Sequence, residues 1–143
     1  MFKHHIFAYL IDLNRNYPYV WRYVPNSCTG QSHPGPYAMS EPEIKANADY
    51  MATFKDNLRL YLSVHTYGDY VLFPFGFDFD VWVNNWREHI LVGQKFVDAI
   101  YAASGNTKYY ELGNSADLLY TANGASGKCD FRYNCICHKP NLY

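Results

Sequence analysis

The spacing of the apolar residues constrains the fold of this chain more than any other feature. From Leu58 to Val64 every second residue is aliphatic, so Leu58, Leu60, Leu62 and Val64 share one face. A period of two is typical of a β-strand, in which successive side chains point to opposite faces of a sheet. We therefore predict a strand over 58–64 whose aliphatic row is buried under a helix.

Helical spacing occurs on both sides of this segment. Ser40-Glu41-Pro42-Glu43 predicts a helix N-terminus with Ser40 as the N-cap, and apolar residues then recur at helical spacing to about Asp56. A second apolar run, 70–75, predicts another strand, and residues 86–103 carry a second helical pattern that Gly105 ends. Strands that alternate with helices of more than ten residues indicate an α/β sheet with at least some parallel strands.

Composition excludes several classes of protein. The chain has 143 residues, 49% of them hydrophobic, and a formal net charge of -1. Such a chain can bury a core as one domain, and it lacks the basic surface that nucleic acid requires. No segment approaches the roughly 20 apolar residues of a membrane span, and the apolar run Ile6 to Ile11 is too short for a signal peptide.

The four cysteines are Cys28, Cys129, Cys135 and Cys137, and three of them lie in the last fifteen residues. Together with His138 the last three could supply four donors to a structural zinc ion. Their spacing is not that of a common zinc module, so unpaired or mispaired cysteines are the preferred interpretation. Sequence alone does not give their pairing.

His65 is the most informative single residue, because it ends the predicted strand on the face opposite the aliphatic row. In an open α/β sheet, ligands bind beyond the carboxyl ends of the strands. A lone histidine in this position can equally be a hydrogen-bonded structural residue. The segments around it favour the functional interpretation.

Five segments, in order along the chain, resemble the zinc metallocarboxypeptidases of the carboxypeptidase A/B family. They are Asp12-Leu13-Asn14-Arg15-Asn16, Gly35 to Glu43, Leu62-Ser63-Val64-His65-Thr66-Tyr67, Phe73-Pro74-Phe75-Gly76-Phe77 and Leu119 to Ser126. The resemblance implies a zinc carboxypeptidase fold, of which this chain is a fragment with a mixed, mainly parallel sheet and flanking helices. It covers 11–126 as a partial catalytic domain, with 1–10 and 127–143 as termini that do not match.

The resemblance also implies roles for particular residues. Asn14 and Arg15 would bind the C-terminal carboxylate of a substrate, Tyr120 would close over it, Thr66 and Tyr67 would shape neighbouring subsites, and His65 would be the third ligand of a catalytic Zn²⁺. A guanidinium beside an amide matches the two oxygens of a carboxylate. The alternatives are a polar turn at 12–16, an ordinary loop aromatic at Tyr120, and packing at Thr66 and Tyr67.

Part of the family's catalytic set is not recognisable. A catalytic zinc needs about three protein ligands, and the family takes two from an upstream His-x-x-Glu, but no histidine of this chain has Glu three positions later. Residues 121–143, where the family's general base would follow the tyrosine loop, contain no Glu. We therefore expect no catalytic residue in this chain.

Two functions follow from this comparison. The first is a zinc metallocarboxypeptidase by family, extracellular by resemblance, in a truncated form that is inactive alone and retains one of three zinc ligands. The alternative is a non-catalytic protein that binds the C-terminal carboxylates of peptides. Both take peptide or protein C-termini as partners, and neither takes nucleic acid or a membrane. Specificity for the substrate side chain stays open.

Overall fold

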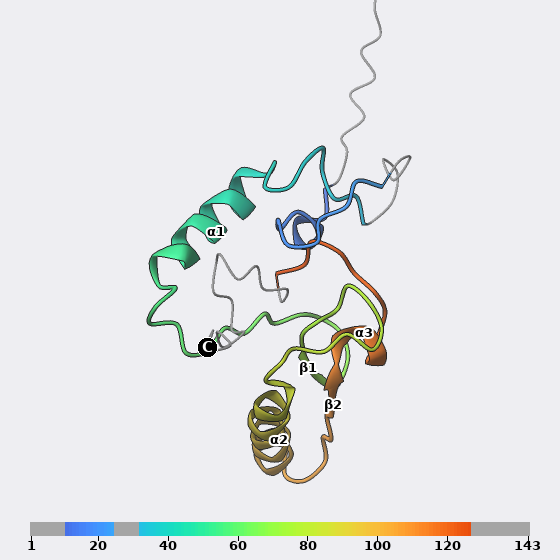
Figure 1. Cartoon of the computed structure of the whole chain (residues 1–143). Helices are drawn as coiled ribbons and strands as arrows, with labels where there is room; N and C mark the ends of the chain where they lie inside the picture. Colours follow the sequence, from blue (N-terminus) through green and yellow to red (C-terminus); the bar gives the residue numbers. More distant parts are fainter. Residues whose placement is uncertain (1–10, 25–31, 127–143) are drawn as a thin grey trace, which may run out of the picture.

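The computed structural model describes residues 11–24 and 32–126. The elements in order are the 3-10 helix η1 (Leu13–Arg15), α1 (Pro42–Thr53), β1 (Tyr70–Phe73), α2 (Trp86–Ala103), β2 (Glu111–Asn114) and α3 (Ser115–Leu118). Figure 1 shows α1 well separated from the β-strands and α2, with a long segment joining them. The chain after α3 runs back to η1.

The two strands of the described residues form a parallel pair, with Tyr70 opposite Glu111 and Phe73 opposite Asn114. Helix α2 connects them, so 70–114 is a β-α-β unit. The close approach of α2 to β2 depends on Gly93, because a Cβ there would overlap the Leu112 side chain. The predicted α/β class is confirmed, because the described residues hold parallel strands joined by a crossover helix.

Helix α2 begins and ends where the apolar spacing predicts. After Ala103 the backbone N–H of Gly105 donates to Ala102 (3.2 Å), and that of Asn106 donates to Tyr101 (2.9 Å). This pair of bonds is the Schellman arrangement, which requires a left-handed residue such as Gly105, whose φ is +67°. The glycine thus satisfies two helix carbonyls and turns the chain towards β2.

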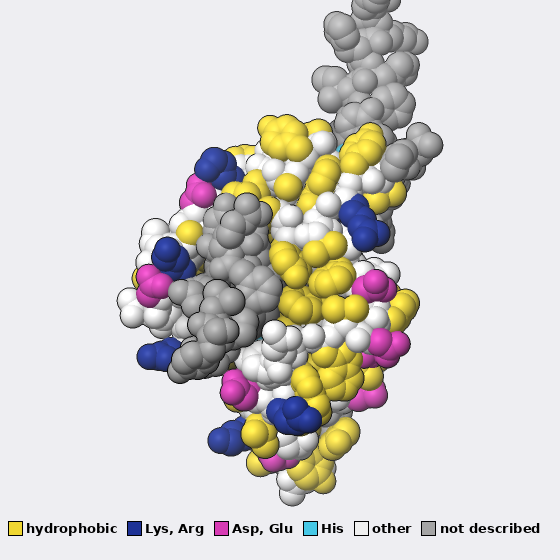
Figure 2. All heavy atoms as spheres, in the orientation of Figure 1, with side chains coloured by type: hydrophobic (Ala, Val, Ile, Leu, Met, Phe, Trp, Pro, Cys, Tyr) yellow, Lys and Arg dark blue, Asp and Glu magenta, His cyan; other side chains and the backbone are white. Residues whose placement is uncertain are grey.

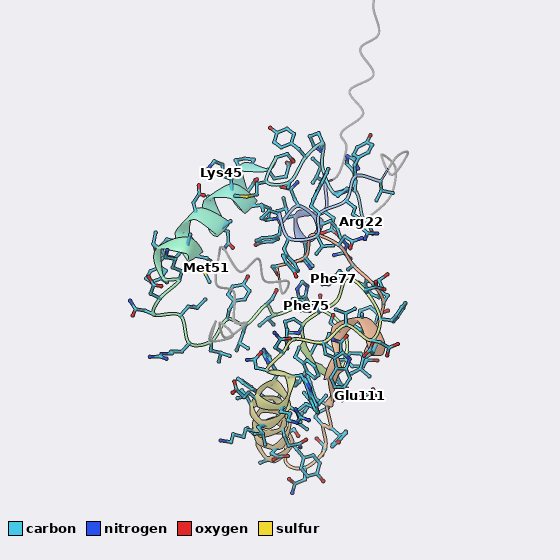
Figure 3. All side chains as sticks on the ribbon, viewed as in Figure 1. Arg22, Lys45, Met51, Phe75, Phe77 and Glu111 are labelled. Atoms are coloured by element: carbon cyan, nitrogen blue, oxygen red, sulfur yellow. The ribbon has the colours of Figure 1, made fainter. Side chains whose placement is uncertain are left out.

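An aromatic cluster connects the amino-terminal segment to the loop after β1. Phe75 and Val83 are buried at its centre, and Tyr19, Phe77, Val81 and Trp86 pack against them. The Tyr19 and Phe75 rings stack with their centroids 5.7 Å apart, and those of Phe75 and Phe77 are 5.2 Å apart. Figure 3 shows the two phenylalanines between η1 and the β-α-β unit. Such ring pairs are worth roughly 0.5–1.5 kcal/mol beyond burial alone, so the cluster fixes η1 relative to β1.

The predicted strand over 58–64 is wrong. The segment has no regular secondary structure, and its aliphatic row is not buried under a helix, since Leu60, Leu62 and Val64 are all exposed and Val64 is 89% exposed. A strand requires hydrogen bonds from a neighbouring strand, and the described residues offer none beside this segment. His65 consequently does not lie at the carboxyl end of a strand.

Helix α1 also differs from the prediction in detail. Glu41, not Ser40, is its N-cap residue, and the helix ends at Thr53 rather than near Asp56. Ser40 Oγ is instead used in tertiary contacts, accepting from Asn16 Nδ2 (2.9 Å) and donating to Glu41 (2.7 Å). None of the helices in the described ranges is long and apolar enough to cross a membrane.

Candidate functional site

The site begins with the tight turn at η1, which presents Asn14 and Arg15. Asp12 caps this turn, because its Oδ1 accepts from the Asn14 backbone N–H (2.9 Å) and its carbonyl accepts from that of Arg15 (2.8 Å). The guanidinium of Arg15 donates through Nη1 to the Asn14 carbonyl (2.8 Å), and the same nitrogen lies 3.8 Å from Asp12 Oδ2. One end of the guanidinium is therefore held in place, and the side chain is 15% exposed.

Asn16 holds the next loop against this turn. It is fully buried (0% exposed), and its Nδ2 lies within hydrogen-bonding distance of the carbonyls of Pro34 (2.8 Å) and Tyr37 (3.0 Å), as well as Ser40 Oγ. Its Oδ1 accepts from the Glu41 N–H at the start of α1 (3.1 Å). Asn16, the last polar residue of the motif, thus has a structural role, which was not predicted from the sequence.

The segment 120–126 lies across η1 and fixes the orientation of Asn14. Gly124 accepts from the Tyr17 backbone N–H (2.9 Å), and the Ser126 backbone N–H donates to Asn14 Oδ1 (2.8 Å). Gly124 has φ +64°, and a Cβ there would lie 2.8 Å from the Arg15 carbonyl carbon. Because Oδ1 is occupied, the amide nitrogen of Asn14 is the atom available to an incoming group, and no hydrogen bond uses it within the described residues.

His65 reaches the same place through two serines. Ser63 Oγ lies 2.9 Å from His65 Nε2 and 2.9 Å from Ser126 Oγ, and Ser126 is buried. A continuous series of hydrogen bonds therefore runs from His65 through Ser63 and Ser126 to Asn14. Ser63 and Ser126 were not predicted as site residues, although Ser63 shares the face of His65 in the period-two pattern.

Tyr120 completes the cluster on the side of Arg15, whose Cζ lies 6.0 Å from the centroid of the tyrosine ring. That distance is at the limit of a cation–π contact, and Tyr120 is otherwise exposed. The structure thus brings together four of the six predicted site residues, Asn14, Arg15, His65 and Tyr120. Thr66 and Tyr67 follow His65 at the surface, where Tyr67 is fully exposed.

A sequence profile of the family described as zinc carboxypeptidase matches residues 4–138 of the chain. The chain belongs to the zinc carboxypeptidase family. Curated relatives include carboxypeptidase O of Bos taurus, 38% identical over 117 residues, and carboxypeptidase B2 of Mus musculus, 33% identical over 118 residues. Each alignment covers 80% of this chain, but the chain spans only 30% and 28% of the length of these relatives.

Solved structures give the same result for this zinc carboxypeptidase chain. Carboxypeptidase A from Helicoverpa armigera superposes with a TM-score of 0.74 at 30% identity, over 81% of this chain and 28% of that protein. Bovine thrombin-activatable fibrinolysis inhibitor, solved in complex with tick carboxypeptidase inhibitor, superposes with a TM-score of 0.75 at 30% identity, over 87% of this chain and 42% of that protein. The fold of the described residues is therefore part of a carboxypeptidase fold.

The described residues do not by themselves fit the zinc ion that the family name implies. No group of three His, Cys, Asp or Glu able to hold a metal occurs among them, whereas a catalytic zinc needs about three protein ligands. His65 is one exposed donor whose Nε2 lies beside Ser63 Oγ. The tail residues weighed above as an alternative zinc site, Cys129, Cys135, Cys137 and His138, lie outside the described residues, as does Cys28.

Proposed function

We propose that Asn14 and Arg15 bind the C-terminal carboxylate of a peptide. The observation that carries this proposal is the hydrogen bond from the Ser126 N–H to Asn14 Oδ1, which leaves the amide nitrogen as a donor beside the guanidinium. Two donor groups held by the backbone suit an anion with two oxygens. Because Arg15 is fastened through one nitrogen, its remaining N–H groups are oriented before the ligand arrives.

Tyr120 is the residue that covers the bound carboxylate in this proposal. Its ring lies beside the guanidinium, and its exposure leaves it free to move towards the ligand and donate its hydroxyl. Thr66 and Tyr67 would contact the residues that precede the C-terminus, because they follow His65 directly. These roles agree with those that the resemblance of the motifs implies.

At the level of the whole protein, the proposed activity is removal of C-terminal residues from peptides, outside the cell, by a zinc-dependent site. Residues 11–126 would be part of the catalytic domain, and His65 one of its zinc ligands. When bound, zinc would polarise the scissile carbonyl and activate water. Asn14, Arg15 and Tyr120 would hold the carboxylate and orient the peptide. The chain spans about 30% of the length of the first curated relative reported above.

The second candidate is a protein that captures peptide C-termini without cleaving them. What favours it for the isolated chain is the absence, from all 143 residues, of a histidine followed three positions later by Glu. Capture of a carboxylate by Asn14 and Arg15 requires no metal. Both candidates therefore share the same binding step, and they differ in whether cleavage follows it.

The binding step is tested with one peptide made as a free acid and as a C-terminal amide. We expect the 143-residue chain to bind the free acid roughly 10–100-fold more tightly, which corresponds to about 1.5–3 kcal/mol for charge-assisted hydrogen bonds. Arg15→Gln should abolish the difference, whereas the exposed Arg22→Gln should retain it. Equal affinities for acid and amide would refute the proposal.

Cleavage is tested separately, by release of the C-terminal residue from a blocked dipeptide with zinc added. The isolated chain should release none above background. Turnover that a chelator stops and His65→Ala abolishes would favour the enzyme over the non-catalytic binder.

A further inference from the structure

An open hollow of about 890 Å³ lies at the amino ends of β1 and β2. Its lining includes Tyr67, Asp69, Tyr70, Tyr109, Glu111 and Leu119. None of the residues proposed to bind the carboxylate lines it. Its size is within the range of about 300–1,000 Å³ that small ligand sites occupy, so it can accept a side chain of a bound peptide.

The two carboxylates of the hollow belong to Asp69, which directly precedes β1, and to Glu111, the first residue of β2. Tyr70 and Glu111 are opposite each other in the parallel register, and the Glu111 N–H donates to the Asp69 carbonyl (2.8 Å). Neither side-chain carboxylate has a hydrogen bond or an ion pair in the part of the chain that the structure describes. Lys108, the cation nearest in sequence, is not one of the lining residues. Two neighbouring negative charges without a counter-charge favour a cationic occupant.

The walls of the hollow are aromatic and accessible. Tyr67 is fully exposed, Tyr109 is 70% exposed, and Tyr70 is also exposed. Tyrosine rings attract a cation over their faces and give apolar contact to the methylene groups of a long side chain. A site that combines such rings with carboxylates suits lysine or arginine better than a metal ion or an aliphatic side chain.

Two residues that line the hollow are close in sequence to residues of the candidate site. Tyr67 lies two residues beyond His65, and Leu119 immediately precedes Tyr120. We propose that this hollow is a subsite for a lysine or arginine that lies upstream of the captured C-terminus, so that the preferred ligands are peptides with an internal basic residue. This inference rests on the proposed capture of the C-terminal carboxylate.

The test uses short acetylated peptides with a free C-terminal carboxylate and one variable position, second, third or fourth from the end. Lysine at that position is compared with norleucine, which has a similar length and no charge, by fluorescence titration against the 143-residue chain. At one of these positions the lysine peptide should bind about 5–10-fold more tightly than the norleucine peptide. The expected difference is small because exposed ion pairs and cation–π contacts each contribute little free energy. The preference should fall as salt is added.

Variants assign the preference to the hollow. Asp69→Asn combined with Glu111→Gln should remove it, whereas Asp98→Asn, which changes an exposed carboxylate on α2, should retain it. Tyr109→Leu removes one ring and keeps both charges, so it should reduce the preference and preserve its salt dependence. The Tyr109 variant keeps the test decisive if the double variant fails to fold.

The outcomes separate this inference from the proposed function. A preference for free acid over amide without any preference for lysine overturns the subsite and leaves the carboxylate site standing. A lysine preference that survives both carboxylate substitutions overturns the assignment to this hollow. If lysine is preferred equally in free acids and amides, the hollow binds basic side chains but the proposed capture of the C-terminus fails.

Discussion

Replacement of Gly124 by alanine tests how the segment 120–126 is fastened to η1. Gly124 has φ +64°, a conformation that costs a residue with a Cβ roughly 1–2 kcal/mol. The new Cβ would also lie 2.8 Å from the Arg15 carbonyl carbon and 3.0 Å from the Tyr17 carbonyl oxygen. Both neighbours are backbone atoms, so the two segments must move apart.

Gly105 provides the matched control. Its φ is +67°, so alanine there meets the same conformational cost, but a Cβ would have no heavy atom within 4 Å. Separation at Gly124 additionally weakens the bonds from Tyr17 to Gly124 and from Ser126 to Asn14. At about 1 kcal/mol for each net hydrogen bond, Gly124→Ala should lower the free energy of unfolding by roughly 2 kcal/mol more than Gly105→Ala.

Urea unfolding followed by tryptophan fluorescence gives this difference, and peptide binding gives its functional consequence. Gly124→Ala should lose the preference for a free acid over an amide, because Asn14 is no longer oriented, while Gly105→Ala retains it. If the two variants lose equal stability and bind equally well, the contact between 120–126 and η1 does not organise the site.

Three further predictions follow from other contacts. Asn16→Ala should lower the free energy of unfolding by about 1–3 kcal/mol, because it leaves buried polar groups without partners. Asn47→Ala, at an exposed position, is the control, and equal losses of stability for the two variants in denaturant titrations would contradict the prediction. Ser126→Pro removes the N–H that orients Asn14 and should abolish the preference for a free acid in peptide titrations, whereas Ser126→Ala keeps that N–H and the preference. Val64→Lys should lower the aggregated fraction in light scattering and change stability by less than about 0.5 kcal/mol, because Val64 is 89% exposed; an unchanged aggregated fraction would mean that another surface drives association.

The elements that sequence predicts best are those whose pattern is satisfied locally. Helix α2 spans 86–103 as its apolar spacing predicts, since a helix forms its backbone hydrogen bonds within itself and Gly105 ends it. Strand β1 was also predicted. It pairs in parallel with β2, which follows the crossover helix α2 in the chain. Spacing therefore predicted β1 and α2 of the β-α-β unit, whereas β2 was not predicted.

The strand predicted over 58–64 shows the limit of this reasoning. A period of two says which side chains share a face, but it says nothing about the neighbour that must supply hydrogen bonds to the backbone. Figure 2 shows hydrophobic side chains gathered over much of one face of the molecule. Among the described residues no strand pairs with the alternating segment 58–64, and most of its side chains stay exposed, as Val64 does.

The candidate site was predictable in its residues but not in its connections. Asn14 and Arg15 were singled out by their motif, whereas the bond that orients Asn14 comes from Ser126, 112 residues away in sequence. Asn16 likewise bonds to residues 18 to 25 positions away. Contacts of this kind leave no local period, because they join a side chain to the backbone of a distant loop.

These long-range bonds explain why a small set of donors can act as one site. The turn at 12–16 contains only the three-residue 3-10 helix η1, and the segments 63–65 and 120–126 lie outside the regular elements. Two hydrogen bonds join the segments, from the Ser126 N–H to Asn14 and between the hydroxyls of Ser63 and Ser126, and a third bond within 63–65 joins Ser63 to His65. A carboxylate bound to Asn14 and Arg15 should therefore also stabilise the segment 63–65, because Asn14 is connected to it through Ser126 and Ser63. Binding should accordingly protect the amide hydrogens of 63–65 and 124–126 against exchange with solvent, and protection confined to 12–16 would show that the three segments respond independently.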